Sequence, residues 1–177
     1  MRFHATPLAG AWVIELERIA DDRGWFARSF DVVEFRARGL PTEIVQANAS
    51  ISRRRGTLRG MHYQAAPDGE SKLVRCPRGR IFDVAVDLRP DSPSYCRWHA
   101  VELDATNGLM FYVPPGMAHG FQTLADDCEV DYLMGHEFVP EAGRGVRFDD
   151  PTFAIDWPRA DGRIISAKDR GYPDFVP

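Results

Sequence analysis

Most of this chain consists of short segments in which hydrophobic and polar side chains alternate. A period of two residues is typical of β-strands, because successive side chains point to opposite faces of a sheet. Turn-forming residues separate the segments, for example at Pro67–Gly69 and Pro114–Gly116. Many short, evenly spaced strands predict an all-β sandwich or barrel. The strands expected after residue 43 are Ile44–Ser52, Leu58–Gln64, Lys72–Cys76, Arg80–Leu88, Arg97–Leu103, Leu109–Val113, His119–Leu124 and Glu129–Met134.

Helical signals are rare by comparison. Trp12–Arg18 is expected to be a first strand, and Asp31–Arg38 has the N-cap residue, apolar spacing and following Gly39 of a short helix. From Pro151 onward the pattern is irregular, and we expect this segment to close over one end of the barrel. No internal repeat or linker interrupts the pattern. We therefore predict a single domain over residues 1–177, all-β with a few short helices.

Side-chain alternation also indicates which residues face the interior. The polar residues of Gln46–Ser52 all fall on one face, a pattern that taken alone favours a face exposed to solvent. Tyr132, however, shares a face with Cys128, Val130 and Met134, so its hydroxyl is expected to point inward. A barrel with an apolar end and a polar mouth accommodates both strands.

The segment Arg80–Leu88 contributes to the same interpretation. Its apolar residues alternate with two carboxylates, so we expect a core stripe on one face and the acids on the other. The stripe is Phe82, Val84, Val86 and Leu88, opposite Asp83 and Asp87.

Arg59 and His62 lie three residues apart within Leu58–Gln64, so strict alternation would place them on opposite faces. For both to reach one cavity, the alternation must slip by one residue between them. Gly60 is expected to provide this slip as a β-bulge.

Composition and charge narrow the possible function classes. The chain has 177 residues with ordinary globular proportions of hydrophobic (44%) and charged (27%) residues, and its net charge of −4 argues against general nucleic-acid binding. Its cysteines lack CxxC spacing and are expected to be reduced thiols. No apolar run approaches the roughly 20 residues of a membrane span, and no signal peptide is evident. We expect a cytoplasmic protein without a membrane partner.

Two histidines raise the possibility of a metal site. The segment Pro114–His119 resembles the second half of a metal-binding cupin signature, but the first half requires a His-x-His pair where this chain has His62-Tyr63-Gln64. Too few ligands remain for a catalytic metal. We predict that no metal is bound.

Without a metal, His62 is a candidate general base, because an imidazole titrates near neutral pH. The inward-facing Tyr132 can exchange a proton on the opposite side of a substrate, and Lys72 can stabilise an oxyanion between them. Base, acid and cation together suit epimerisation next to a carbonyl group. Taken singly, Tyr132 could equally be a core residue and Lys72 a surface lysine.

The sequence resembles the dTDP-4-dehydrorhamnose 3,5-epimerase family of the cupin superfamily. The resemblance extends in order over most of the chain. The segments that carry it are Asp22–Phe26, Gln46–Asn48, Thr57–Gln64, Lys72–Val74, Gly79–Asp87, Ser92–Pro93, Val113–Phe121, Arg147–Pro151 and Ser166–Asp169.

The resemblance implies a cupin-type jelly-roll barrel that epimerises a nucleoside-diphosphate 4-keto-6-deoxyhexose without a cofactor. It places the base on His62, oriented by Asp169, and the acid on Tyr132. Lys72 would hold the enolate oxygen, and His119 would line the sugar site. Family positions that contact the nucleotide and its pyrophosphate correspond to Arg23, Gln46, Asn48, Arg59 and Lys168. The resemblance also implies a homodimer with exchanged N-terminal strands, in which Arg23 serves the neighbour's site.

The chain departs from the family on the nucleotide side. Arg28 and Gly143 stand where family members usually have glutamates, and Phe138 replaces the tyrosine of Tyr-x-Pro, so that the aromatic ring remains without its hydroxyl. Arg28 and Phe138 are retained as expected substrate-binding residues. These departures leave the identity of the nucleotide base open, whereas the residues expected to carry the reaction are all present.

Several alternatives stay open at this point. The enzyme could invert only C3 or only C5, or act on a sugar linked to a nucleotide other than thymidine. A non-catalytic cupin that binds sugar nucleotides would be a different class, and a metal-dependent oxygenase or isomerase of the same fold a third.

Overall fold

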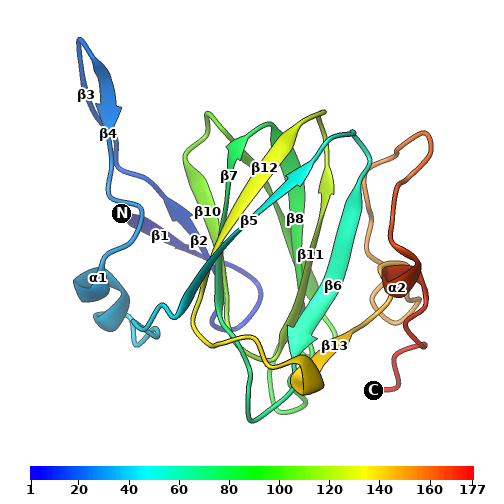
Figure 1. Ribbon diagram of the computed structural model, residues 1–177. Helices are drawn as coiled ribbons and strands as arrows, with labels where there is room; N and C mark the ends of the chain where they lie inside the picture. The colour runs from blue at the N-terminus through cyan, green and yellow to red at the C-terminus, as the bar shows by residue number, and fades with distance from the viewer.

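The computed structural model describes residues 1–177 and is built mainly of short β-strands (Figure 1). The helical elements are α1 (Val32–Arg36), the 3₁₀ turn η1 (Pro140–Ala142) and α2 (Ala167–Arg170). The strands are β1 (Arg2–Ala5), β2 (Trp12–Glu15), β3 (Ile19–Asp21), β4 (Gly24–Phe26), β5 (Gln46–Ser52), β6 (Leu58–Gln64), β7 (Lys72–Arg78), β8 (Arg80–Asp87), β9 (Trp98–Asp104), β10 (Leu109–Val113), β11 (Met117–Thr123), β12 (Cys128–Met134) and β13 (Gly143–Gly145).

Two antiparallel sheets face each other across the barrel (Figure 1). One has the strand order β1-β2-β10-β7-β12-β5, and the other has the order β13-β6-β11-β8-β9. From β5 to β8 and again from β9 to β12, each successive strand lies in the opposite sheet, which is how a jelly roll is wound. The predicted all-β, jelly-roll fold is confirmed.

Most predicted strands are present, with ends shifted by a few residues. β6 and β10 have the predicted boundaries, whereas β7 continues to Arg78 and β11 begins earlier, at Met117. The short helix is also present, and Asp31 caps it by accepting hydrogen bonds from the N–H groups of Val33 and Glu34. The elements that were not predicted are β1, β3, β4, η1, β13 and α2.

The protein has three hydrophobic cores: one between the sheets, one on the outer face of the five-stranded sheet, and one in which Phe35 of α1 packs against the six-stranded sheet. Ile81 and Ala85 of β8 pack in the inner core, with residues such as Phe111 of the opposite sheet. Val84 and Val86 pack instead in the outer core, against the C-terminal segment that runs beside β6 in Figure 1.

The predicted orientation of β8 was therefore wrong. The stripe containing Phe82 and Val84 faces the C-terminal segment, with Phe82 in edge-on contact with Trp157. Asp83 and Asp87 are fully buried. Because the C-terminal segment covers the outer face, both faces of β8 are buried, and alternation alone cannot identify the inner one.

The predicted bulge at Gly60 is confirmed. β6 pairs with β11 through His62 and His119, and then through Arg59 and Phe121, so β6 contains one extra residue between the two pairs. Gly60 has φ of 125°, and an added Cβ would lie 2.5 Å from the Gly120 Cα atom. The bulge turns Arg59 and His62 toward the same side.

The β3–β4 hairpin projects away from the barrel (Figure 1). It leaves Ile19, Trp25 and Phe26 largely exposed. None of the helices has the length and apolar character needed to cross a membrane.

Candidate active site

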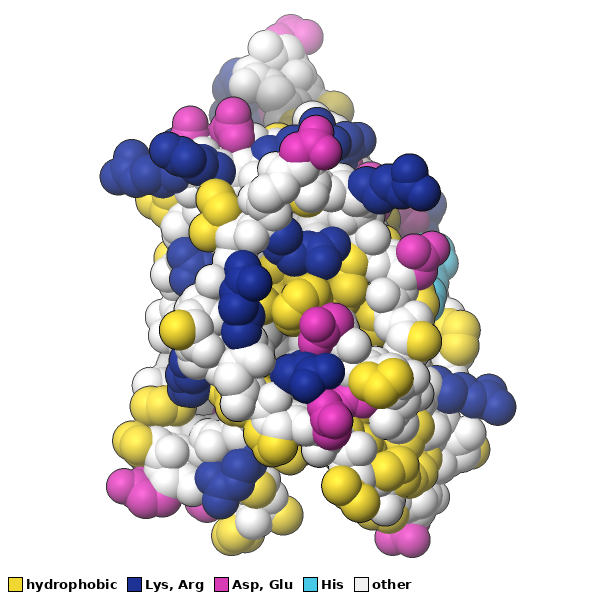
Figure 2. Space-filling view, turned by 90° about the vertical axis from the view of Figure 1, so that its right-hand side faces the viewer, with side chains coloured by type: hydrophobic (Ala, Val, Ile, Leu, Met, Phe, Trp, Pro, Cys, Tyr) yellow, Lys and Arg dark blue, Asp and Glu magenta, His cyan; other side chains and the backbone are white.

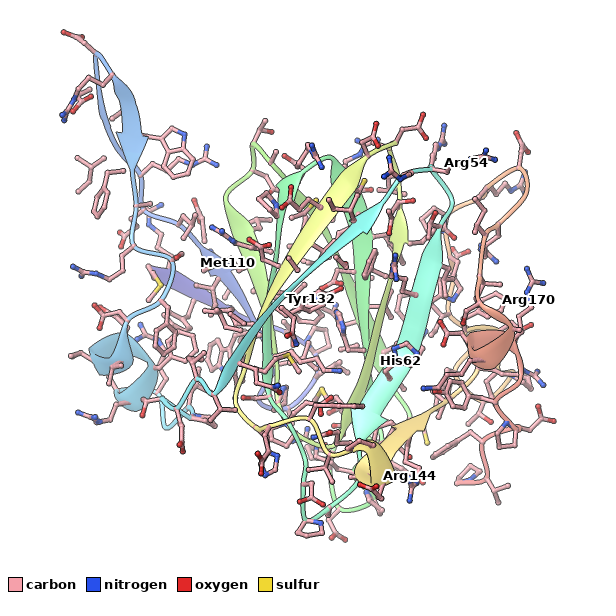
Figure 3. All side chains as sticks on the ribbon, in the orientation of Figure 1. Arg54, His62, Met110, Tyr132, Arg144 and Arg170 are labelled. Carbon is pink, nitrogen blue, oxygen red and sulfur yellow. The ribbon has the colours of Figure 1, made fainter.

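A cavity of about 700 Å³ opens between the two sheets, a size typical of small-molecule sites. His62 of β6 and Tyr132 of β12 both line it, from the five-stranded and the six-stranded sheet respectively (Figure 3). The predicted common cavity is confirmed. Other lining residues include Asn48, Ser50, Arg59, Lys72, His119, Lys168 and Asp169.

His62 and Asp169 form a hydrogen-bonded pair. Nε2 of His62 lies 2.7 Å from Oδ1 of Asp169, whose other oxygen accepts a 3.3 Å hydrogen bond from the Gly60 N–H. Helix α2 holds Asp169 in place, since the N-cap Ser166 accepts from the Asp169 N–H. Burial lowers the pKa of His62, and Asp169 partly opposes this effect. The imidazole is therefore neutral near pH 7 and able to accept a proton.

Tyr132 keeps its phenolic proton near neutral pH and can donate it to a substrate. Burial raises the pKa of its phenol, although a hydrogen bond with Ser50 counteracts part of that shift. The two hydroxyl oxygens are 3.3 Å apart. The Tyr132 ring lies edge-on to the ring of His119, with 6.1 Å between the centroids.

Lys72 is buried, contrary to the alternative of a surface lysine. Its Nζ atom lies 3.0 Å from a carboxylate oxygen of Glu70 and donates a 3.0 Å hydrogen bond to the main-chain oxygen of His62. The side chains of Lys72 and Glu70 are only 9% and 8% exposed. A cation is thus fixed beside the candidate base.

A second histidine–carboxylate pair is buried at the cavity wall, where His119 lines the cavity. Nε2 of His119 is 2.8 Å from Oδ1 of Asp83, and both side chains are buried. Burial raises the pKa of Asp83, while His119 opposes the rise. His62 and His119 each pair with one carboxylate, and no group of three His, Cys, Asp or Glu side chains is placed to hold a metal ion. Freedom from metal stays a prediction.

Five of the predicted substrate-binding residues other than His119 lie in or beside the cavity. Asn48, Arg59 and Lys168 line it directly, and Arg59 is held by Ser52 through a 3.1 Å hydrogen bond. An adjoining pocket of about 460 Å³ shares Asn48, His62 and Lys168 with the cavity. Gln46 and Phe138 line that second pocket, together with Tyr63, Arg144 and Tyr172.

Arg23 and Arg28 do not reach this cavity within one chain. Arg23 is exposed in the β3–β4 hairpin and pairs with Asp21, and Arg28 pairs with Asp31 at the start of α1. On the face that carries α2 and the C-terminal segment, Lys and Arg side chains are mixed with acidic and hydrophobic ones (Figure 2).

Sequence reasoning missed several residues that support the site. Glu70 precedes Lys72 by two positions, so the alternation that places Lys72 inward could have suggested Glu70 too. Asp83 was assigned to the wrong face. Tyr172, whose ring lies 6.2 Å from that of His62, follows Asp169 closely but had no recognisable signal.

Comparison with known proteins identifies close relatives. A model of the dTDP-4-dehydrorhamnose 3,5-epimerase family matches residues 5–176. An enzyme of that name from Methanothermobacter thermautotrophicus is 47% identical over 174 residues, covering 97% of this chain and 92% of the relative. A dTDP-4-dehydrorhamnose 3-epimerase from Streptomyces niveus is 40% identical over 159 residues, covering 89% of this chain and 76% of the relative.

Solved structures similar to this chain come from the same family. The dTDP-4-dehydrorhamnose 3,5-epimerase of Elizabethkingia anophelis matches with a TM-score of 0.95 and 37% identity, covering 99% of this chain and 96% of the other. The Bacillus anthracis enzyme, which has TDP and PPi bound, matches with a TM-score of 0.93 and 36% identity, covering 98% of this chain and 99% of the other. This chain is an isomerase that belongs to the dTDP-4-dehydrorhamnose 3,5-epimerase family.

Proposed function

We propose that this chain is a metal-free epimerase that inverts C3 and C5 of dTDP-4-dehydro-6-deoxyglucose, giving dTDP-4-dehydrorhamnose. The observation that carries the proposal is the placement of His62, paired with Asp169, and Tyr132 on facing sheets of one cavity. A base and an acid on opposite sides of a sugar ring are what inversion of a carbon centre requires. Family membership supports the substrate class.

In the proposed reaction, the C4 ketone makes the hydrogens on C3 and C5 acidic. Neutral His62 removes one of them as a proton, and the electron pair of the broken C–H bond moves to the C4 oxygen to give an enolate. The Lys72 ammonium stabilises that oxygen. Tyr132 then donates a proton to the same carbon from the opposite face, and the proton on His62 returns to the phenolate through solvent. A second cycle inverts the other carbon.

The thymidine nucleotide is proposed from the relatives and from the cations at the site. The related Bacillus anthracis enzyme has TDP bound. Arg59 and Lys168 line the cavity and can donate charge-assisted hydrogen bonds to the two phosphates. Phe138 is 66% exposed beside the adjoining pocket, where its ring can stack on a nucleotide base.

Inversion of C3 alone is the second candidate. The Streptomyces niveus relative, which is 40% identical, is a 3-epimerase. The two reactions use the same base, acid and cation and differ in which hydrogen lies nearest His62. Small displacements of the ring are enough to change this.

We also propose that two copies pair through their N-terminal segments. The β3–β4 hairpin projects from the barrel, and its Trp25 and Phe26 are 54% and 66% exposed, so a partner surface would shield them. Arg23 on this hairpin would then reach the partner's cavity. Sedimentation equilibrium should give twice the chain mass of 20.0 kDa, and a monomer would contradict this pairing.

Proton NMR in deuterated water tests the function directly. With dTDP-, UDP- and GDP-linked 4-keto-6-deoxyglucose, the thymidine compound should lose both its H3 and H5 signals fastest. Loss of H3 alone would identify a 3-epimerase. Tight binding without any exchange would identify a non-catalytic binding protein instead.

Metal analysis of the purified protein provides a separate check. Because His62 and His119 each pair with a carboxylate, we expect far less than one metal ion per chain and no effect of a chelator on exchange. Stoichiometric metal together with chelator-sensitive activity would favour the metal-dependent alternative.

A further inference from the structure

Glu70 is a buried carboxylate that takes no direct part in the proposed chemistry. It lies two residues before the start of β7 and lines the pocket that adjoins the main cavity. Its Oε1 atom is 3.0 Å from Lys72 Nζ, and both side chains are less than one-tenth exposed. A buried ammonium group needs a partner of this kind, because an unpaired charge is costly to remove from water.

Two contacts hold the Lys72 ammonium group, an ion pair with Glu70 and a hydrogen bond to the main chain. An ammonium group has three N–H donors. One donates to the main-chain oxygen of His62 over 3.0 Å, and the Glu70 carboxylate forms an ion pair with Nζ, also at 3.0 Å. Lys72 lines the cavity, so an N–H that is not used in these contacts is available to a substrate oxygen. Two fixed contacts restrict a lysine side chain that would otherwise move among many rotamers.

We propose that Glu70 is a positioning residue that orients Lys72, so that its remaining N–H points to the C4 oxygen of the substrate. The inference rests on the proposed function, because it assigns the developing enolate charge to Lys72. A donor fixed before the reaction stabilises the transition state without reorganisation. Removing Glu70 should therefore slow turnover more than it weakens binding.

Glu70→Ala should lower kcat at least tenfold with dTDP-4-dehydro-6-deoxyglucose, while KM stays within about threefold. Glu70→Gln retains an oxygen that can accept from Lys72, so it should recover most of the lost kcat. Glu141→Gln, at an exposed carboxylate outside the cavity, is the matched control and should keep kcat within twofold. A purely structural role for Glu70 would not separate kcat from KM in this way.

The same substitutions in a Lys72→Met background separate the two proposals. If Glu70 acts through Lys72, Glu70→Ala should cause no further loss of kcat there, and this comparison remains informative even if the single Glu70→Ala variant does not fold. A further tenfold loss, or a folded Glu70→Ala variant with kcat within twofold of the wild type, would overturn the positioning role. If Lys72→Met itself leaves kcat unchanged, the role of Lys72 in the proposed function fails instead.

Discussion

His62 Nε2 and Asp169 Oδ1 are 2.7 Å apart, although 107 residues separate them in the chain. The contact joins β6, in the wall of the barrel, to α2 in the C-terminal segment. The carboxylate fixes which ring nitrogen carries the proton and stabilises the imidazolium that forms when His62 accepts a proton. The C-terminal segment therefore completes the candidate site as well as covering the outer sheet face.

Replacing Asp169 by Asn should lower kcat about 100-fold, because the base loses the charge that orients it and raises its pKa. Single-turnover measurements of C3 and C5 inversion would show the effect on the chemical step. Lys168→Gln is a useful comparison from the same helix, since it should mainly raise KM through the phosphates. If Asp169→Asn and the wild type had equal kcat, the His62–Asp169 pair would be ruled out as the general base.

The pH dependence follows from the direction of the His62 shift. Burial lowers the pKa of His62 in the folded protein below its usual value of about 6.5. Only the neutral ring can accept a proton, so kcat/KM should be level above neutral pH and fall as the pH drops through the lowered pKa. A pH–rate profile should show an acid limb with its midpoint below about 6.5. A midpoint above 7 would contradict a neutral, half-buried base.

Asp87 provides a test of stability away from the cavity. Burial alone would raise its pKa, but hydrogen bonds from Arg89, Ser92 and Ser94 lower it to about 2. Since the folded pKa is below the unfolded one, the stabilisation is complete above about pH 4 and lost as the pH falls toward 2. Asp87→Asn should cost about 2–3 kcal/mol near pH 7, from a shift of nearly two pKa units.

Chemical denaturation at pH 7 and at pH 3 would measure this contribution. The cost of Asp87→Asn should be smaller at the lower pH. Asp91→Asn, at a neighbouring exposed carboxylate, serves as the control and should change the unfolding free energy by less than about 0.5 kcal/mol. If Asp87→Asn lowered the unfolding free energy equally at both pH values, the stabilisation could not come from the ionised Asp87 carboxylate.

Gly60→Ala should disrupt the wall of the site. Gly60 has φ of 125°, and an added Cβ would lie 2.5 Å from the Gly120 Cα atom and 2.9 Å from the His119 oxygen. We expect a loss of at least about 3 kcal/mol, combining backbone strain with a backbone clash. Gly162 also has a positive φ, of 75°, but nothing lies near its added Cβ, so Gly162→Ala should cost only about 1–2 kcal/mol. Thermal melts of the two variants should differ clearly.

The sequence predicted best those features that depend on a short local pattern compatible with only one backbone conformation. The boundaries of β6, the bulge at Gly60 and the inward direction of Tyr132 were all predicted from alternation and turn residues. Each depends on neighbours within a few residues. The family resemblance added Asp169, which no local spacing connects to His62.

Contacts between distant segments explain what was not predicted. β8 was turned the wrong way because the C-terminal segment buries its outer face, an event that the pattern of residues 80–88 cannot reveal. Strand β13 and helix α2 are short elements stabilised by docking against β6 rather than by their own propensity. Asp83 was consequently not recognised as the partner of His119.

The most direct test of the base–acid assignment compares His62→Asn and Tyr132→Phe in deuterated water. We predict that folded His62→Asn exchanges neither the C3 nor the C5 hydrogen, because His62 is the proposed base for both carbons. Tyr132→Phe should still exchange hydrogens from the His62 side, while its rate of inverted product formation falls at least 100-fold. Exchange at the wild-type rate in folded His62→Asn would contradict the account.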